Sequence, residues 1–195
     1  MSMKHTHPIE TVIYGGAFNP PTRAHVAILQ ACFEYAASRN AEVWIMPSGN
    51  RRDKHIPVSR ERRLEYIDAL VCDAARTERD TAKVITTELD RVVSVETADT
   101  VAELSRGYPD RSFTFVFGAD STATMAEWKD GELLLATLSM LVIEREGSCI
   151  NPLAKYATPL RVTTSSVSST QVRALLASGG SIDELVTPSV AQLFA

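Results

Sequence analysis

Short apolar runs alternate along the chain with segments in which apolar residues recur every three or four positions. The first run, Ile9–Tyr14, ends at two glycines, as expected for a buried strand that leads into a tight turn. In the next segment the apolar positions share one face of a helix: Val26, Leu29, Phe33 and Ala36. This part of the chain therefore predicts a strand followed by an amphipathic helix.

The same alternation continues through most of the sequence. Further strands are expected at Val43–Met46, Ala82–Glu88, Ser112–Phe117, Met140–Ile143 and Leu160–Thr163. Helices are expected after Ser59, around Asp99–Ser105 and at Glu132–Ala136. Strands separated by helices predict the α/β class and a single-domain Rossmann-like fold, with a mostly parallel sheet and helices on both faces. No linker or repeat divides the chain, so we expect residues 1–195 to form one domain.

Three helix starts are expected near the end of the chain. The segments 168–171 and 181–184 each fit a capping box, in which a serine and a residue three positions later satisfy each other's backbone donors. Thr187-Pro188 adds a third start, because proline is favoured in the first turn of a helix. Gly179-Gly180 marks the end of the first of these helices.

Composition narrows the function classes. Lys and Arg total 20 and Asp and Glu total 24, so the formal charge is −4, which argues against a protein that binds duplex nucleic acid. The sequence has neither a run of 18 apolar residues nor the apolar core of a signal peptide, so we expect a cytoplasmic protein without a membrane partner. Three widely spaced cysteines predict neither a disulfide framework nor a zinc site built by the protein. The sequence leaves homo-oligomerisation open.

The first candidate for binding chemistry is the segment 15–25, between the predicted first strand and first helix. Gly15 and Gly16 allow backbone N–H groups to approach an anion, and the helix start adds the positive end of a dipole. Thr22 and His25 are three residues apart, so they share one face of the first helical turn and are expected to reach the same phosphate. The alternative interpretation is an ordinary strand-to-helix turn with a surface histidine.

A second candidate is the segment 168–173. The hydroxyl groups of Ser168, Ser169 and Thr170 offer donors to a phosphate, together with the backbone N–H groups of a helix start. Arg173 lies one turn inside the helix and adds a charged donor. The alternative is a capping box without a ligand. Together the two segments predict a polyphosphate site, because ligands of parallel sheets bind beyond the carboxyl ends of the strands.

These motifs resemble the nucleotidyltransferase superfamily. They are Gly-Gly-x-Phe-x-Pro at 15–20, Thr-x-x-His at 22–25 and Ser-Ser-Thr-x-x-Arg at 168–173, and within the superfamily the chain is similar to the nicotinate/nicotinamide mononucleotide adenylyltransferases. Further matches extend over nearly the whole chain: Lys54, Arg63, Thr97, Asp99, Thr100, Gly118, Asp120, Trp128 and Arg145. The common bacterial motif His-x-Gly-His has Thr22 and Ala24 here, and eukaryotic-type members also carry the threonine.

The resemblance implies transfer of the adenylyl group of ATP to nicotinate or nicotinamide mononucleotide in NAD biosynthesis, with release of pyrophosphate. It implies catalytic roles for His25, Lys54 and Arg173. ATP-binding residues would be Gly15, Gly16, Ala17, Phe18, Thr22, His25, Gly118, Asp120, Ser168, Ser169, Thr170 and Arg173. Residues that bind the pyridine mononucleotide would be Gly16, Phe18, Lys54, Thr97, Trp128 and Arg145. Mg²⁺ would be bound mainly through the ATP phosphates, without metal ligands from the protein.

Other interpretations stay open at the level of sequence. One is a related nucleotidyltransferase with another acceptor, of the phosphopantetheine adenylyltransferase or cytidylyltransferase type, and another is a nucleotide-binding protein without turnover. Single residues also have plainer interpretations: Trp128 as a loop anchor, Arg145 as a solvated side chain and Asp120 as a helix N-cap. The choice between the two pyridine mononucleotides is open too, although the positive charge of the loop Asn50–His55 favours the nicotinate carboxylate.

Overall fold

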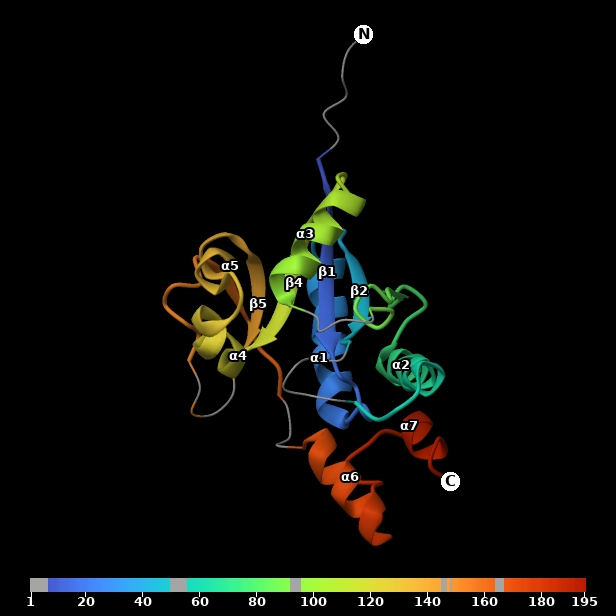
Figure 1. Cartoon of the computed structure of the whole chain (residues 1–195). Coiled ribbons are helices and arrows are strands. Elements are labelled where there is room, and N and C mark those ends of the chain that lie inside the picture. The colour runs from blue at the N-terminus through green and yellow to red at the C-terminus, as the bar shows by residue number, and fades with distance from the viewer. Residues whose placement is uncertain (1–6, 50–55, 92–95, 145–146, 148, 164–166) are drawn as a thin grey trace.

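The computed structural model describes residues 7–49, 56–91, 96–144, 147, 149–163 and 167–195 (Figure 1). Within these residues, six strands form one sheet: β1 (Ile9–Gly16), β2 (Glu42–Pro47), β3 (Ala82–Val84), β4 (Arg111–Gly118), β5 (Ser139–Ile143) and β6 (Tyr156–Leu160). The helices are α1 (Arg23–Ala37), α2 (Arg60–Ala74), α3 (Thr97–Gly107), α4 (Ala119–Thr124), the 3₁₀ turn η1 (Met125–Glu127), α5 (Gly131–Thr137), α6 (Ser169–Ser178) and α7 (Pro188–Gln192).

The sheet is parallel throughout, in the order β3-β2-β1-β4-β5-β6. The expected α/β, Rossmann-like fold is therefore confirmed. The chain builds outward from β1 to β3 and then, starting again at β4, outward to β6, so the direction reverses between β1 and β4. In sheets of this kind the ligand lies beyond the carboxyl ends of the strands next to the reversal.

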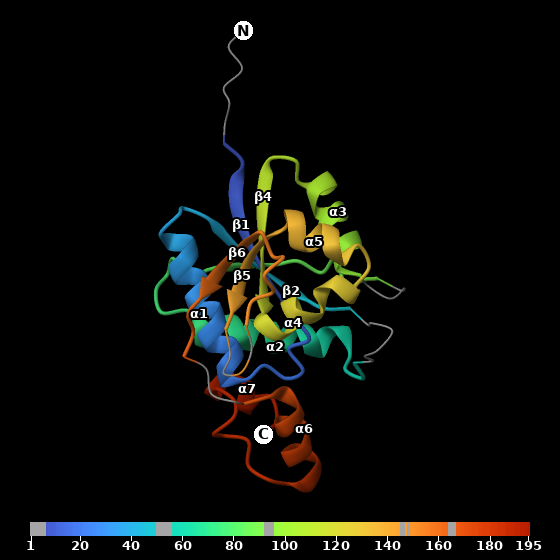
Figure 2. The same ribbon diagram turned by 90° about the vertical axis from the view of Figure 1, so that its left-hand side faces the viewer.

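Both faces of the sheet are covered by helices. In β1, Val12 and Tyr14 belong to a core shared with α1 and α2, whereas Ile13 belongs to a core on the other face with α3, α4 and α5. None of the three side chains is more than 4% exposed, so neighbouring residues of the strand are buried on opposite faces. This double burial explains the nearly continuous apolar run in the sequence. Figure 2 shows α1 and α5 on opposite sides of the sheet.

The third strand is shorter than the sequence predicts. The expected range is Ala82–Glu88, but β3 stops at Val84. The backbone N–H of Ile85 still donates to the carbonyl oxygen of Ile45 (3.0 Å), and the chain then leaves the sheet in a turn. Glu88 therefore lies beyond the carboxyl end of a strand, where ligands bind in this class of fold.

The sixth strand lies earlier in the chain than predicted, at Tyr156–Leu160 instead of Leu160–Thr163. It is at the edge of the sheet and pairs with β5. Three of its five residues are exposed, and Pro159 has no backbone N–H to donate, which is tolerated on an edge strand. The strand therefore lacks the apolar run by which the inner strands are found.

The segment 181–184 forms turns rather than the expected helix. The Ser181 hydroxyl donates to the Asp183 carboxylate (2.8 Å) and accepts from the backbone N–H of Asp183 (3.3 Å), so this serine closes a local turn. Beyond it, the carbonyl oxygen of Leu185 accepts from the backbone N–H of Arg23 at the start of α1 (3.0 Å). The Leu185 carbonyl oxygen, which would accept a hydrogen bond within a helix, thus accepts a long-range hydrogen bond instead.

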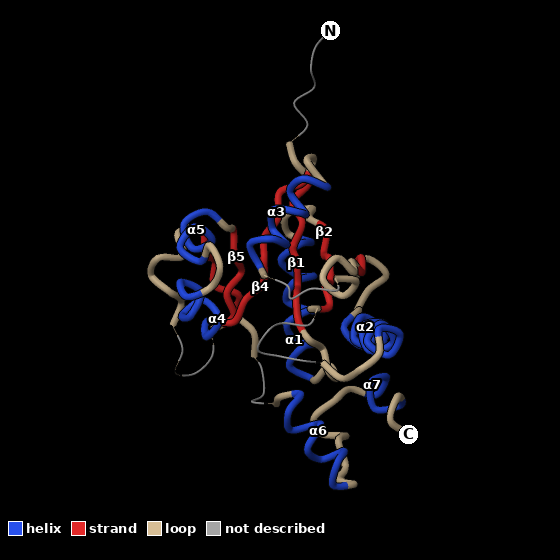
Figure 3. Tube along the Cα trace, in the orientation of Figure 1, coloured by secondary structure: helices blue, strands red, loops and turns tan. Residues whose placement is uncertain are grey.

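α6 and α7 form a further group of helices beyond the carboxyl edge of the sheet, which Figure 3 shows at the bottom of the view. Their N-caps, Ser168 and Thr187, are helix starts that the sequence predicts. Val172 of α6 and Val190 of α7 are fully buried in a small core that they share with Ala69 of α2. This core attaches α6 and α7 to α2.

In the part of the chain that the structure describes, no helix is long and apolar enough to cross a membrane. The three cysteines are free, with Cys32 buried and Cys72 and Cys149 on the surface. The assignment of residues 1–195 to one domain stays a prediction.

Candidate functional site

A cavity of about 870 Å³ lies beyond the carboxyl ends of β1, β2, β4 and β5. Small-molecule and cofactor sites usually have volumes of roughly 300–1,000 Å³. The wall of the cavity includes the loop after β1, the starts of α1, α3 and α6, and the turn η1. The cavity therefore occupies the place that the strand order indicates for a ligand.

The loop after β1 brings its main chain against the cavity. Gly15, Gly16 and Ala17 all line it. A Cβ at Gly16 would come within 2.9 Å of the Phe18 ring, so the glycine permits this close approach. Phe18 has a φ of 43°, which bulky residues rarely adopt, and its 1% exposed ring packs edge-on against His25, with centroids 5.4 Å apart. Packing therefore maintains a backbone conformation that the residue would not adopt by itself.

Arg63 supports the same loop from α2. Its side chain is 3% exposed, and its Nη2 donates to the carbonyl oxygen of Ala17 (3.2 Å). Burial lowers the pKa of Arg63 from its ordinary value, and the Glu88 carboxylate acts in the opposite direction. The family resemblance includes Arg63 but assigns it no role. In the structure it lies behind the loop after β1, the candidate phosphate-binding segment, and holds the Ala17 peptide.

His25 is held by the residue that begins its helix. The backbone N–H of Thr22 donates to His25 Nδ1 (3.0 Å), and the Thr22 hydroxyl oxygen lies 2.8 Å from the same nitrogen. Thr22 is the N-cap of α1 and His25 its third helical residue, so the pair forms a capping box with histidine where Glu or Gln is usual. His25 lines the cavity, whereas Thr22 is fully buried behind it.

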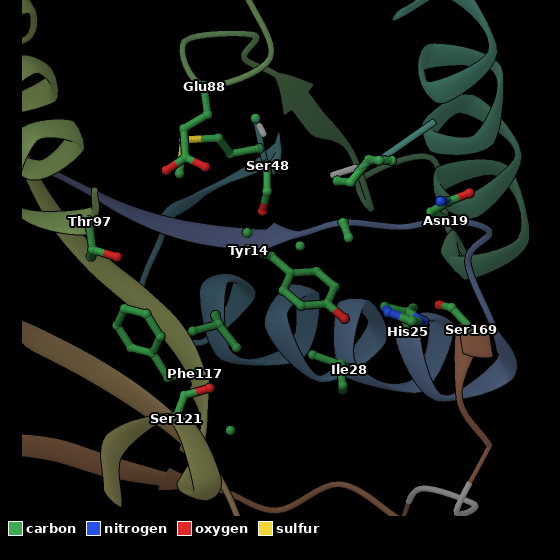
Figure 4. Close-up of a pocket in the computed structure, with 18 of the residues that line it drawn as sticks. Tyr14, Asn19, His25, Ile28, Ser48, Glu88, Thr97, Phe117, Ser121 and Ser169 are labelled. Atoms are coloured by element: carbon green, nitrogen blue, oxygen red, sulfur yellow. The ribbon is translucent and has the colours of Figure 1, made fainter. Parts of the chain in front are cut away.

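The start of α6 faces the same end of the cavity. Its four predicted phosphate-binding residues all line the wall: Ser168, Ser169, Thr170 and Arg173. Ser169 Oγ donates to the carbonyl oxygen of Pro20 (2.8 Å), and Arg173 Nη1 donates to the carbonyl oxygen of Asn19 (2.7 Å). Figure 4 shows Asn19, His25 and Ser169 close together. The two sequence motifs thus meet at what we call the donor-rich end, formed by the loop after β1, His25 and the start of α6.

The opposite end of the cavity, here the α3 end, lies at the start of α3 and at η1. Figure 4 shows Thr97 and Phe117 at this end, well apart from His25. Trp128 follows η1, is half-buried and packs edge-on against Phe117, with ring centroids 6.1 Å apart. Because Trp128 also lines the cavity, it anchors the turn and contributes to the ligand-facing wall at once.

Charged side chains gather at the α3 end. Glu88, Glu96 and Lys129 line the cavity, and Glu88 accepts a hydrogen bond from the buried hydroxyl of Thr100 (3.0 Å). Lys129 Nζ pairs with Asp99 Oδ1 (2.6 Å), and this contact raises the pKa of Lys129 from its ordinary value. Among the described residues, the α3 end therefore contains more carboxylates than cations, in contrast to the donor-rich end.

Most of the predicted site residues in the described part of the chain line this one cavity: Gly15, Gly16, Ala17, His25, Thr97, Gly118, Trp128, Ser168, Ser169, Thr170 and Arg173. Phe18 and Thr22 are buried behind its wall. Asp120 is exposed in the first turn of α4, whose N-cap is Gly118 and not Asp120. A Cβ on Gly118 would clash with Asp120 Oδ1, so the glycine makes room for this carboxylate, which does not line the cavity.

Some predicted site residues lie outside the described residues. These are Lys54 and Arg145, together with the rest of the basic loop Asn50–His55 that would favour the nicotinate carboxylate. The functional roles of all these residues, and of those that line the cavity, stay predictions.

The cavity also contains residues that the sequence does not single out: Ile28, Ser48, Glu88, Glu96, Ser121 and Lys129. Ser48 and Glu88 follow the carboxyl ends of strands, which is a usable signal for a ligand site. The sequence does not reveal Glu88 in this way, because the predicted third strand is too long and includes this residue. Glu96 and Lys129 have no such signal, because sequence spacing does not show which side chains next to a helix start face a cavity.

Comparison with known proteins relates this chain to nucleotide-transferring enzymes. The Cytidylyltransferase-like family matches residues 13–175, a range that includes both the loop after β1 and the start of α6. The probable nicotinate-nucleotide adenylyltransferase of Exiguobacterium sibiricum is 33% identical over 183 residues, covering 93% of this chain and 93% of the relative. A protein of Ruegeria pomeroyi with the same name is 30% identical over 155 residues, covering 77% of this chain and 68% of the relative.

A solved structure shares the fold. It is the Plasmodium falciparum nicotinic acid mononucleotide adenylyltransferase complexed with NaAD, which matches 94% of this chain and 93% of its own with a TM-score of 0.81. The two sequences are 20% identical, so this likeness supports the fold alone.

Proposed function

Since the chain belongs to the Cytidylyltransferase-like family, and within it to the nicotinate-nucleotide adenylyltransferases, we propose that it transfers the adenylyl group of ATP to nicotinate or nicotinamide mononucleotide. The products are the dinucleotide of NAD biosynthesis and pyrophosphate. The observation that carries the proposal is the meeting of the loop after β1 and the start of α6 in one cavity, opposite Thr97 and Trp128. One end suits a triphosphate and the other a planar ring.

The reaction needs no nucleophile from the protein. An oxygen of the mononucleotide 5′-phosphate forms a bond to the α-phosphorus of ATP, and the bond from that phosphorus to the bridging oxygen of the β-phosphate breaks. A phosphate monoester has a second pKa near 6, so the attacking phosphate is largely a dianion at neutral pH. The tasks of the protein are therefore to align two anions and to stabilise charge on the transferring group.

His25 is the proposed catalytic donor to the α-phosphate. Its ring lines the donor-rich end, in the first turn of α1, where the helix dipole favours negative charge. A hydrogen bond that strengthens as charge builds on the phosphoryl oxygens lowers the barrier, because it is stronger in the transition state than in the ground state.

The start of α6 is proposed to hold the ATP phosphates through hydroxyl and guanidinium donors. A guanidinium has five N–H groups, and Arg173 uses two of them, on the Asn19 carbonyl and on Thr170 Oγ1 (3.1 Å). The remaining donors serve phosphate oxygens, and the two protein contacts fix the plane of the guanidinium beforehand. Arg173 thus links the loop after β1 to α6 and binds ATP in the same arrangement.

The α3 end is proposed to take the pyridine ring of the acceptor. The ring face of Trp128 suits a cationic pyridinium, which is attracted to the negative face of an aromatic ring. Thr97 supplies polar groups at the N-terminus of α3. Lys54 and Arg145 complete the proposed acceptor site by resemblance.

Mg²⁺ is proposed to arrive with ATP. Among the described residues, no group of three or more His, Cys, Asp or Glu side chains is placed to hold a metal ion. The donors that line the start of α6 are hydroxyls, and they fit a hard cation bound mainly by phosphate oxygens and water. When bound, the ion compensates phosphate charge and thereby assists departure of pyrophosphate.

An acceptor panel tests the proposed function. The purified protein is incubated with ATP or CTP and with one acceptor at a time: nicotinate mononucleotide, nicotinamide mononucleotide or phosphopantetheine. Pyrophosphate release and the nucleotide product are measured together. We expect release only with ATP and a pyridine mononucleotide. Pyrophosphate release with phosphopantetheine but with neither pyridine mononucleotide, or with CTP but not with ATP, would indicate a related transferase. ATP binding without pyrophosphate release would indicate a non-catalytic protein.

Removal of the charge on Glu96 is expected to shift the acceptor preference towards nicotinate mononucleotide. This side chain lines the α3 end next to Thr97, where it repels the extra carboxylate of nicotinate but not the neutral amide. We expect this repulsion, partly screened by salt and water, to change the ratio of the kcat/KM values for the two acceptors by roughly threefold.

The measurement compares both acceptors for wild type and Glu96→Gln at low and at high salt. Glu132→Gln is the control, because Glu132 is exposed on α5 and does not line the cavity. A ratio that is the same in Glu96→Gln and wild type at low salt would remove Glu96 from the acceptor site.

A further inference from the structure

The hydrogen bond between Thr22 and His25 has a fixed direction. Its donor is the backbone N–H of Thr22, which has no way of accepting, so His25 Nδ1 accepts with its lone pair. In a neutral imidazole one nitrogen carries the proton and the other accepts. The ring proton of neutral His25 is therefore on Nε2, and the bond that the other nitrogen makes decides this.

The same contact fixes the orientation of the ring. Thr22 is 0% exposed, so the edge of the ring that carries Nδ1 is turned towards the interior. His25 lines the cavity, and in a ring held through Nδ1 the other nitrogen, Nε2, is the one that can face it. Phe18 packs edge-on against the ring with an interplanar angle of 65°, which hinders its rotation.

The Thr22 hydroxyl has a place in this arrangement. Its oxygen lies 2.8 Å from Nδ1, so it is also committed to the histidine. Full burial keeps it away from the cavity, where a phosphate would be. The sequence predicts Thr22 as a second phosphate ligand beside His25, because both lie on one face of the first turn. The contacts favour a different role.

We propose that Thr22 is a positioning residue, which holds His25 with its Nε2–H directed into the cavity and does not itself bind phosphate. The inference rests on the proposed function, in which that N–H donates to the α-phosphate of ATP. A donor that is already oriented needs no rearrangement when charge develops in the transition state. Loss of the Thr22 hydroxyl therefore lowers kcat and leaves ATP affinity unchanged. Loss of a phosphate ligand would have the opposite effect.

The kinetic test uses Thr22→Val, which keeps the shape of the side chain and removes the hydroxyl. We expect kcat to fall roughly fivefold, the rate equivalent of one neutral hydrogen bond, with an unchanged KM for ATP. Thr22→Ser restores the hydroxyl and should stay within about twofold of wild type. Thr187→Val is the control for the loss of a buried N-cap hydroxyl, because Thr187 begins α7 away from the cavity and its hydroxyl has no hydrogen-bond partner among the described residues.

A second measurement does not depend on turnover. With ¹⁵N-histidine in the wild-type protein, the two ring nitrogens of His25 are identified by comparison with His25→Asn. In the neutral ring the proton is expected on Nε2. Thr22→Val keeps the backbone N–H donor but loses the hydroxyl contact, so a larger share of the ring protonated on Nδ1 is expected there. This spectrum tests the positioning role even if the wild-type protein transfers no adenylyl group, so the failure of the proposed function and that of the inference are distinguished.

Three results would overturn the inference. One is a proton on Nδ1 of His25 in the wild-type protein. The second is a Thr22→Val protein with unchanged kcat and a raised KM for ATP, which would make Thr22 a phosphate ligand. The third is a fall in kcat for Thr187→Val equal to that for Thr22→Val, which would reduce the effect to a general consequence of replacing a buried threonine by valine.

Discussion

Replacement of His25 by asparagine is expected to lower kcat by roughly 10²- to 10³-fold while the fold is retained. Asparagine places its side-chain oxygen near the position of Nδ1, where it still accepts from the backbone N–H of Thr22. It places nothing near Nε2, so the donor to the transferring phosphoryl group is lost. Steady-state kinetics at saturating ATP and nicotinate mononucleotide measure the effect.

His25→Gln is the matched control for this substitution. Glutamine reaches the position of Nε2 with an amide N–H but does not reproduce the ring contact with Phe18. We expect His25→Gln to keep more activity than His25→Asn. Thermal unfolding shows that both proteins are folded. Wild-type turnover in a folded His25→Asn protein would show that His25 is not catalytic.

The second large effect is expected at Arg173. Substitution by methionine removes the guanidinium and keeps an unbranched side chain that suits a helix. A charge-assisted hydrogen bond contributes about 1.5–3 kcal/mol, so affinity for a non-hydrolysable ATP analogue should fall roughly 10- to 100-fold. The helix itself should persist, because it is held by the buried Val172. Calorimetric titration measures the affinity.

Arg23→Met separates ligand binding from loss of a structural contact. Arg23 Nη2 donates to the carbonyl oxygen of Asp183 (3.0 Å), as Arg173 donates to that of Asn19, but Arg23 does not line the cavity. ATP affinity should therefore be nearly unchanged in Arg23→Met. Equal losses in the two variants, or no loss in Arg173→Met, would exclude Arg173 from the ATP site.

The sequence predicts the fold and the donor-rich end well, for a physical reason. Strands buried on both faces leave apolar runs such as Ile9–Tyr14, and helix starts leave capping residues such as Ser168. In a parallel sheet the carboxyl ends of all strands lie along one edge, so motifs at 15–25 and 168–173 were expected to meet there, and they line one cavity.

What sequence spacing does not reveal is the direction of side chains. Thr22 and His25 share a helix face, yet the buried N-cap hydroxyl turns to the histidine instead of the cavity. Glu88 is hidden in a strand-like run and becomes visible as a cavity residue only because β3 stops early. Ser181 fits a capping box by spacing, but its hydroxyl closes a turn with Asp183 instead.

If the proposed function is right, the α-phosphorus of ATP moves to the acceptor in this cavity. The most direct measurement follows ³²P from ATP labelled at the α- or the γ-phosphate, with nicotinate mononucleotide as acceptor. We predict that α-label appears in the dinucleotide and γ-label only in pyrophosphate, and that His25→Asn slows both by the same factor. An absence of labelled dinucleotide from folded wild-type protein with both substrates and Mg²⁺ present, or γ-label in the acceptor product, would show that the protein does not transfer the adenylyl group.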